Sequence, residues 1–254
     1  MNAFNFLLSA VIVAVYLLFT QNSIHIPSLL YGIPYGVLFV SMVFFYNKAV
    51  STGKISSSNF ILALAMLIPI ICGALFLNET VLPLQIAGIV LFLVASYFVC
   101  FTKEEGDKKV SKKSYLYIVI ACISSGGMSI FIKLISNADS SVDQVQMLAS
   151  AMLTGGILMT VLFAIQTRFK NFGDYVRPKW FWLSLLIVVL STAVGNIMYV
   201  IFIVRVPAVI FFPIASGLPM LLGAAVSPLF KEKLSVKGII GIVLGVVAIV
   251  LLNL

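Results

Sequence analysis

The sequence predicts an all-α membrane protein, a polytopic bundle of about nine transmembrane helices. Hydrophobic residues make up 62% of the 254-residue chain and charged residues only 9%, whereas a soluble domain carries about a quarter charged residues. The charges fall in short clusters between apolar runs that approach the roughly 20 residues needed to cross the hydrocarbon core. Such runs have to be helices, because every backbone polar group in lipid must be satisfied within its own segment. The runs cover residues 3–20, 29–47, 56–77, 83–101, 115–135, 145–166, 181–204, 207–229 and 236–253.

Basic residues are distributed asymmetrically between these runs. All of the 16 Lys and Arg residues except Lys133 and Arg205 lie in the connections after the second, fourth, sixth and eighth runs. The positive-inside rule therefore places these connections and the amino terminus in the cytoplasm, and Leu254 outside. The same placement argues against nucleic acid as a partner despite the net charge of +8. We predict a multi-pass protein of the cytoplasmic membrane, with the lipid bilayer as its surroundings.

The first two runs are uncharged and rich in aromatic residues. The first lacks the basic n-region and the small-residue cleavage site of a signal peptide, so we predict a span that is retained. The second places Tyr35, Phe39, Met42 and Tyr46 on one stripe of a helix. This stripe fits ordinary helix packing, and it also fits contact with a solute.

The third and fourth runs are separated by a single carboxylate. Pro69 lies inside the third run and leaves the carbonyl of Ala65 without its helical hydrogen bond. Glu79 follows this run, at a position that suits an interaction with a helix N-terminus. A role of Glu79 in proton coupling is the alternative. The fourth run then reads QIAGIVLFLVASYF over residues 85–98.

The fifth run carries Ser124, Ser125, Gly126 and Gly127 near its middle. Small residues let neighbouring helices approach, and serine hydroxyls can bond across the interface. Ser124 and Ser125 therefore have a packing role or contact a solute. Lys133, near the outer end, either snorkels to the interface or contacts an anion at a pocket mouth. The sixth run has no charged residue.

The seventh run places Thr192, Asn196 and Tyr199 on one helical face, at positions i, i+4 and i+7. An asparagine in hydrocarbon is costly unless it is paired. Two explanations remain, solute contact in a cavity and an interhelical hydrogen bond.

The eighth run is rich in proline. Pro213 frees the carbonyl of Val209, as Pro69 does for Ala65 in the third run. Interrupted helices at matching places in two halves of a chain indicate a transport site or a gate. Tolerated kinks are the alternative.

The ninth run, GIIGIVLGVVAIVL over residues 238–251, repeats the fourth. The two copies lie 153 residues apart, so that Gly88 pairs with Gly241, and Glu79 and Glu232 precede them at equal distance. An odd number of crossings separates the copies, which predicts an inverted repeat of the kind found in secondary transporters. The GxxxG motif of Gly241 and Gly245 packs a helix within the chain or joins two chains into a homodimer.

The repeat resembles a known family. The stretches FFYNKAVSTGKISSSNFILALAMLIPIICGALFLNETVLPLQIAGIVL and YVIFIVRVPAVIFFPIASGLPMLLGAAVSPLFKEKLSVKGIIGIVLG are similar to the closing three helices of the EamA-type repeat in the drug/metabolite transporter superfamily. The matching positions are Tyr46, Lys48 and Glu79 in the first half, and Tyr199, Arg205, Pro219 and Glu232 in the second. Pro69 departs from the pattern, since it lies ten residues before its Glu whereas Pro219 lies thirteen before.

The resemblance implies ten helices in two sets of five. This chain offers four in a first repeat over residues 1–102, a charged cytoplasmic linker over 103–113 and five in a second repeat over 114–254, so the first helix is the one without a counterpart. The resemblance also implies a transporter of small metabolites or drug-like solutes that works by alternating access, with export as the direction. The family's cytoplasmic carboxy terminus disagrees with our placement of Leu254.

From these observations we predict a substrate site and no catalytic centre. The predicted substrate-binding residues are Asn196, Tyr199, Tyr46, Thr192, Ser124, Ser125 and Pro213. We predict that Cys72, Cys100 and Cys122 are small apolar residues of the core, and we expect no metal or cofactor. Two other functions remain open, a non-transporting or decayed membrane partner lacking the first helix, and an intramembrane lipid-modifying enzyme. The enzyme would need a His, Asp or Cys constellation in the membrane, and the sequence shows none.

Overall fold

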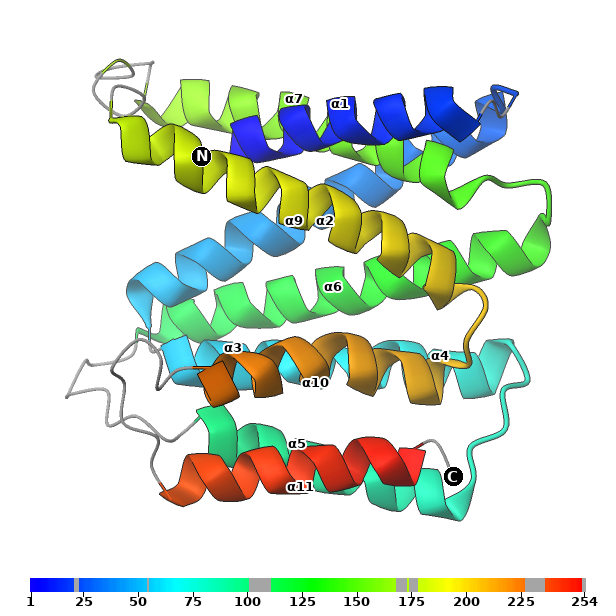
Figure 1. The fold of residues 1–254 in the computed structure, drawn as a ribbon, viewed down its shortest axis with the longest axis vertical. Helices are drawn as coiled ribbons and strands as arrows, with labels where there is room; N and C mark the ends of the chain where they lie inside the picture. Colours follow the sequence, from blue (N-terminus) through cyan, green and yellow to red (C-terminus); the bar gives the residue numbers. More distant parts are fainter. Residues whose placement is uncertain are drawn as a thin grey trace. The chain divides into compact units, whose positions relative to one another are not determined.

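A computed structural model describes residues 1–20, 23–53, 55–100, 111–167, 173, 178–226 and 236–252. Within these ranges each of the nine predicted runs is helical, which confirms the predicted all-α membrane fold (Figure 1). The helices are α1 (Asn2–Thr20), α2 (Ile26–Thr52), α3 (Ile55–Ala63), α4 (Leu67–Phe76), α5 (Pro83–Cys100), α6 (Lys112–Ala138), α7 (Gln144–Thr167), α9 (Lys179–Ile203), α10 (Ala208–Val226) and α11 (Val236–Leu252).

The described helices have the length and composition of membrane spans. Seven segments are long and apolar enough to cross a bilayer, with α3 and α4 contributing to one of them, and two shorter apolar helices follow in the last part of the chain. α2 and α6 are 27 residues each, or about 40 Å at 1.5 Å per residue. Each exceeds the roughly 30 Å of hydrocarbon.

The chain forms two compact units, and each unit is discontinuous in sequence. Unit 1 comprises Met1–Val40 and Phe131–Val204, and unit 2 comprises Ser41–Ile130 and Arg205–Leu254. The divisions at Val40 and Ile130 fall inside α2 and α6. The units therefore do not follow the boundaries of the sequence repeats, because each contains segments from both repeats.

Small residues bring the helices of unit 1 together. α1 packs against α7, where a Cβ on Gly155 would lie 2.8 Å from the ring of Phe6. α2 approaches the same helix, since a Cβ on Gly36 would lie 2.6 Å from the carbonyl oxygen of Ala151. A larger residue would therefore displace the Phe6 ring at Gly155 and the backbone of α7 at Gly36.

In unit 2, α5 and α11 pack side by side through contacts that match the sequence repeat (Figure 1). Gly88 faces Leu252 and the carbonyl of Ala248, and Gly241 faces Val99 and the carbonyl of Ala95. Each residue in one contact has its copy, 153 residues away, in the other. The two helices run antiparallel, and Gly241 and Gly245 are buried. The GxxxG motif thus packs within the chain.

Proline has different effects on the third and eighth runs. A 3₁₀ turn, Leu64–Met66, separates α3 from α4 at the Ala65 carbonyl that Pro69 was expected to free. In contrast, α10 is continuous from Ala208 to Val226, which at Pro213 fits the alternative of a proline tolerated within the helix. α10 contacts α4, α5 and α11. These neighbours hold its helical path, and helices in membranes tolerate the missing proline bond for this reason.

Candidate functional site

Polar side chains of α1 and α9 meet inside unit 1. The Asn5 side-chain amide donates a hydrogen bond to Thr192 Oγ1 at 3.1 Å. One turn further along α1, Ser9 Oγ donates to the carbonyl oxygen of Val189 at 3.4 Å. Ser9 is fully buried. Thr192 therefore has a structural partner on a neighbouring helix, which sequence reasoning did not identify.

Asn196 is half-buried on the same face of α9. Its Nδ2 donates to the carbonyl oxygen of Thr192, one turn earlier, at 2.7 Å. The Asn196 amide oxygen makes no hydrogen bond within the described part of the chain. An amide oxygen is an acceptor for a solute hydroxyl or amine. The geometry therefore leaves Asn196 with one group available to a solute.

An aromatic cluster lies on the α2 side of unit 1. Phe39 makes edge contacts with Tyr35 and Phe6, at ring-centre distances of 6.5 and 4.9 Å. Tyr35 is 0% exposed, and its hydroxyl has no hydrogen-bond partner among the described residues. The Tyr35 hydroxyl is close enough to Tyr199 for the two side chains to interact electrostatically. Buried hydroxyls are normally paired, so the orphaned Tyr35 is a feature that the sequence pattern alone could not identify.

Tyr46, the repeat mate of Tyr199, belongs to unit 2. Its hydroxyl donates to Asn59 Oδ1 of α3 at 2.6 Å. Its ring packs against the buried cluster of Ala49, Ile118 and Ala121. Tyr46 thus has a local structural role, while Tyr199 lies in the other unit.

The remaining predicted site residues, Ser124, Ser125 and Pro213, also lie in unit 2. Gly126 of α6 lies against the side chain of Ile68 of α4. This part of α6 therefore packs closely against α4. The Ser125 carbonyl accepts a hydrogen bond from Ser129 Oγ at 3.0 Å. The structure brings Thr192, Asn196 and Tyr199 together on α9 and assigns the other four residues to the second unit.

Glu79 caps a helix N-terminus in unit 2. Its Oε2 accepts a hydrogen bond from the backbone N–H of Ala208, the first residue of α10, at 2.7 Å. Asn78 adopts a left-handed φ of 53° after the end of α4, and the Glu79 N–H bonds back to the Gly73 carbonyl at 3.2 Å. The left-handed residue and this backbone bond together close the carboxy-terminal end of α4. The predicted interaction with a helix N-terminus is present, and the helix is α10.

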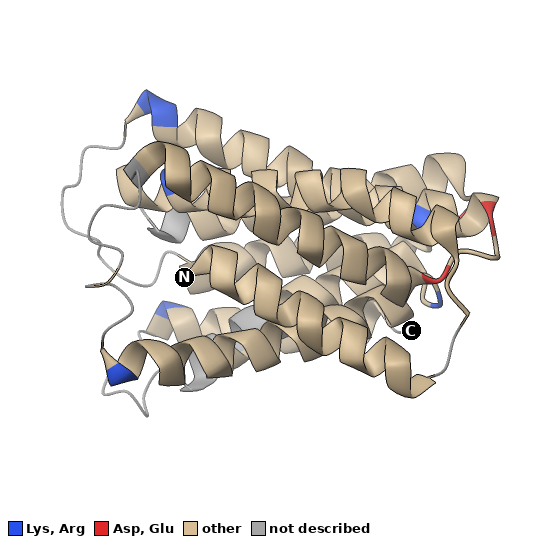
Figure 2. Cartoon of the chain, turned by 90° about the horizontal axis from the view of Figure 1, so that it is seen from above, with Lys and Arg blue, Asp and Glu red and all other residues tan. Residues whose placement is uncertain are grey.

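Most charged side chains of the described helices lie near helix ends and in connections (Figure 2). Lys133, inside α6, is buried. At one end of unit 1, the α1–α2 and α6–α7 connections are joined by hydrogen bonds around His25. The His25 N–H donates to Gln146 Oε1 at 2.7 Å, and Gln146 Nε2 donates to the Ser23 carbonyl at 2.8 Å. Asp143 Oδ1 accepts hydrogen bonds from the backbone N–H groups of Val145 and Gln146, and Asp143 thereby caps the N-terminus of α7.

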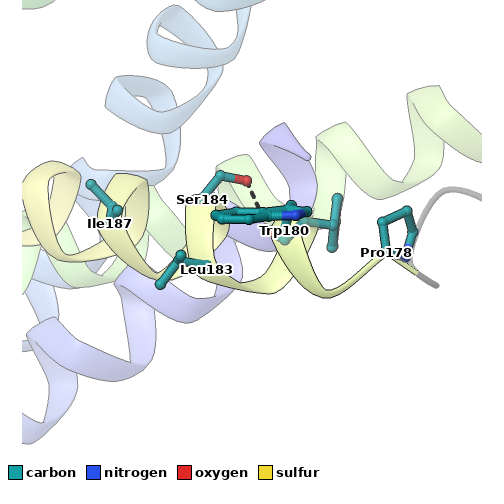
Figure 3. Close-up of a pocket in the computed structure, with 6 residues that line it drawn as sticks. Pro178, Trp180, Leu183, Ser184 and Ile187 are labelled. Carbon is teal, nitrogen blue, oxygen red and sulfur yellow. Dashed lines mark hydrogen bonds between the residues drawn. The ribbon is translucent and has the colours of Figure 1, made fainter.

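A shallow hollow of ≈ 560 Å³ lies at the start of α9. Its lining is mostly apolar: Pro178, Trp180, Phe181, Leu183, Ser184 and Ile187 (Figure 3). The Ser184 hydroxyl donates to the Phe181 carbonyl of its own helix at 3.0 Å. Trp180 is 77% exposed. None of the predicted site residues reaches this hollow, and we attribute it to the lipid-facing surface.

The described residues contain no group of three or more His, Cys, Asp or Glu side chains that could hold a metal ion. Cys72, Cys100 and Cys122 are free thiols.

Comparisons with known proteins identify a family and a fold. The profile of the EamA-like transporter family matches residues 112–254, which is more than half of the chain. No curated protein matches the sequence. A solved crystal structure is similar with a TM-score of 0.75 over 99% of this chain and 86% of its own, at 15% sequence identity. At that identity the likeness concerns the fold alone.

Proposed function

The chain belongs to the EamA-like transporter family, and from that premise we propose that it exports a small metabolite or drug-like solute across the cytoplasmic membrane by alternating access. The apolar helices and the repeated α5 and α11 sequences support this proposal. Few charged residues lie along the described helices, so the solute is uncharged or weakly charged and amphiphilic. A multiply charged solute would meet too few compensating charges.

The proposed site centres on Thr192, Asn196 and Tyr199 of α9. One observation carries it, namely the Asn196 amide oxygen that is not hydrogen-bonded to the described protein residues. Leaving such a group unpaired in an apolar setting costs free energy. A solute that donates a hydrogen bond to this oxygen regains that free energy. Tyr46, Ser124, Ser125 and Pro213 remain sequence-based predictions for the same function.

Transport by the purified protein in proteoliposomes tests the proposal. A panel of labelled amphiphilic solutes, uncharged and singly charged, would be loaded and their protein-dependent flux measured. Asn196→Ala should weaken the apparent affinity for a transported solute roughly two- to twelvefold, the equivalent of one hydrogen bond of about 0.5 to 1.5 kcal/mol.

Ser184→Ala is the matched control. Its hydroxyl also bonds to its own helix, α9, but at the exposed start of that helix, so its removal should leave solute affinity unchanged. An unchanged affinity in Asn196→Ala, with a clear loss of thermal stability, would assign Asn196 to packing. Absence of flux for the whole panel would count against the transport function itself.

A further inference from the structure

A tyrosine hydroxyl is enclosed in unit 1 without a hydrogen-bond partner among the described residues. The Tyr35 side chain of α2 is fully buried, and its oxygen makes no hydrogen bond there. The rings of Phe39 and Phe6 form the apolar cluster beside it. A phenylalanine at position 35 would fill nearly the same space without burying a polar atom. Ring packing alone therefore does not explain the hydroxyl.

The surrounding helices offer few acceptors to this hydroxyl. Carbonyl oxygens along a membrane helix are already engaged in the hydrogen bonds of that helix. The helix that carries Tyr35 is also held in place, because a Cβ on the next residue, Gly36, would lie 2.6 Å from the carbonyl oxygen of Ala151 on α7. A rotation of α2 would bring a larger side chain into this contact. A partner for the hydroxyl therefore has to come from outside the packed helices.

Tyr35 lies next to the proposed solute site on α9. Its side chain interacts electrostatically with Tyr199, and Tyr199 shares a face of α9 with Asn196, three residues earlier. The Asn196 amide oxygen is a hydrogen-bond acceptor, whereas the Tyr35 hydroxyl can donate. The two side chains therefore offer complementary groups, an acceptor and a donor, within one unit.

We propose that Tyr35 is a further solute-binding residue, whose hydroxyl donates a hydrogen bond to an oxygen of the solute. In this conformation the hydroxyl is closed off, and alternating access opens it to solute and water. The assignment rests on the proposed function and adds a class of solute to it. The solute carries an acceptor such as a carbonyl oxygen for Tyr35, beside the N–H or O–H group that Asn196 would bind.

Hydroxyl-radical footprinting of the wild-type chain in nanodiscs tests whether water reaches Tyr35 during conformational exchange. Radicals formed from water oxidise the side chains that water contacts, and mass spectrometry locates the products. Met152 of α7 is the internal control, because it is also 0% exposed and its thioether is readily oxidised. We expect oxidation of Tyr35 and protection of Met152. Protection of Tyr35, or equal oxidation of both residues, would overturn the proposal.

The hydrogen bond itself is tested in proteoliposomes with pairs of labelled solutes that differ by one carbonyl oxygen, beginning with (5-oxohexyl)trimethylammonium and hexyltrimethylammonium. Tyr35→Phe should weaken the apparent affinity for the ketone roughly two- to twelvefold, as for one lost hydrogen bond. The affinity for the analogue without the oxygen should stay unchanged. Tyr31→Phe is the matched control, since it removes the same group one turn earlier on α2, where the side chain is 37% exposed. It should change neither affinity.

Failure of this assignment differs from failure of the proposed function. Flux by the wild type with equal ketone affinity in wild type and Tyr35→Phe would remove Tyr35 from the site and leave the transport function standing. A wild type that moves only solutes without an oxygen acceptor would refute the solute class. Absence of wild-type flux for every solute would remove the transport function, and the solute role of Tyr35 with it. The footprint uses no variant, so it decides the opening at Tyr35 even if a substituted chain does not fold.

Discussion

Removal of the Glu79 carboxylate should destabilise unit 2 in two separable steps. The carboxylate accepts the Ala208 N–H at 2.7 Å, so Glu79→Ala removes both a hydrogen bond and a negative charge from the α10 N-terminus. Loss of a helix cap costs about 1–2 kcal/mol. Glu79→Gln keeps an amide oxygen as the acceptor and loses only the charge, which is worth about 0.3–1 kcal/mol at a helix terminus.

These energies translate into melting temperatures. A change of 1 kcal/mol shifts the melting temperature of a chain of this size by about 2–4 °C. Glu79→Ala should therefore lower it by about 2–8 °C, and Glu79→Gln by about 1–4 °C. Far-UV circular dichroism of the detergent-solubilised protein can follow both, because it reports on the helices of unit 2 as well as those of unit 1.

Gly73 provides an internal check on this geometry. A Cβ at Gly73 would lie 2.8 Å from Glu79 Oε2 and 3.2 Å from the Cβ of Ala208. Gly73→Ala should thus displace the carboxylate and cost about 1–3 kcal/mol. In the Glu79→Ala background the added methyl has more space, so the two effects should be less than additive by about 0.5 kcal/mol or more.

Strict additivity of these two substitutions, or equal stability of wild type and Glu79→Ala, would refute the capping role. A proton-coupling role predicts another pattern. Glu79→Gln would then abolish solute flux without lowering the melting temperature.

Three further predictions concern other parts of the chain. Gly88→Val and Gly241→Val should each destabilise the α5–α11 contact, by about 1–3 kcal/mol, and a fall in melting temperature for only one would contradict their equivalent packing. Tyr35→Phe should stabilise the protein by up to about 1–3 kcal/mol, because it removes a buried hydroxyl that has no partner among the described residues, and a lower melting temperature would show that the hydroxyl is bonded. Hydrogen bonds from the Ser141 side chain and backbone, with His25 nearby, lower the pKa of Asp139. Its contribution to stability is present above the unfolded pKa and is lost as the pH falls through the lower folded pKa. Ser141→Ala should therefore raise the pKa of Asp139 in a ¹³C carboxylate titration and move this loss to higher pH.

The helices could be predicted from the sequence because lipid allows so few alternatives. An apolar run of span length has to be helical, and charged clusters mark its ends. The GxxxG motif of Gly241 and Gly245 also indicated a close helix contact, while leaving open whether it lies within the chain or between two chains. Even the 3₁₀ turn beside Ala65 follows from the local effect of Pro69 on its own helix.

Contacts between distant segments could not be predicted in the same way. Glu79 was expected near a helix N-terminus, but its contact with α10 depends on a turn at Asn78 and on tertiary packing. The hydrogen bonds of His25 join residues that no sequence period relates. Pro213 has the same local chemistry as Pro69, yet α10 stays continuous because three neighbouring helices support it.

The discontinuity of unit 1 also has a consequence for how the protein is made. Asn5 and Thr192 are separated by 187 residues, which the ribosome takes roughly 10 to 40 s to add at about 5–20 residues per second. During that time α1 has entered the membrane while α9 does not yet exist. Until α9 is made, the amide of Asn5 and the hydroxyl of Ser9 need other hydrogen-bond partners, such as water, lipid headgroups or an insertion chaperone. The newly made α1 is therefore exposed to quality control until α9 is inserted.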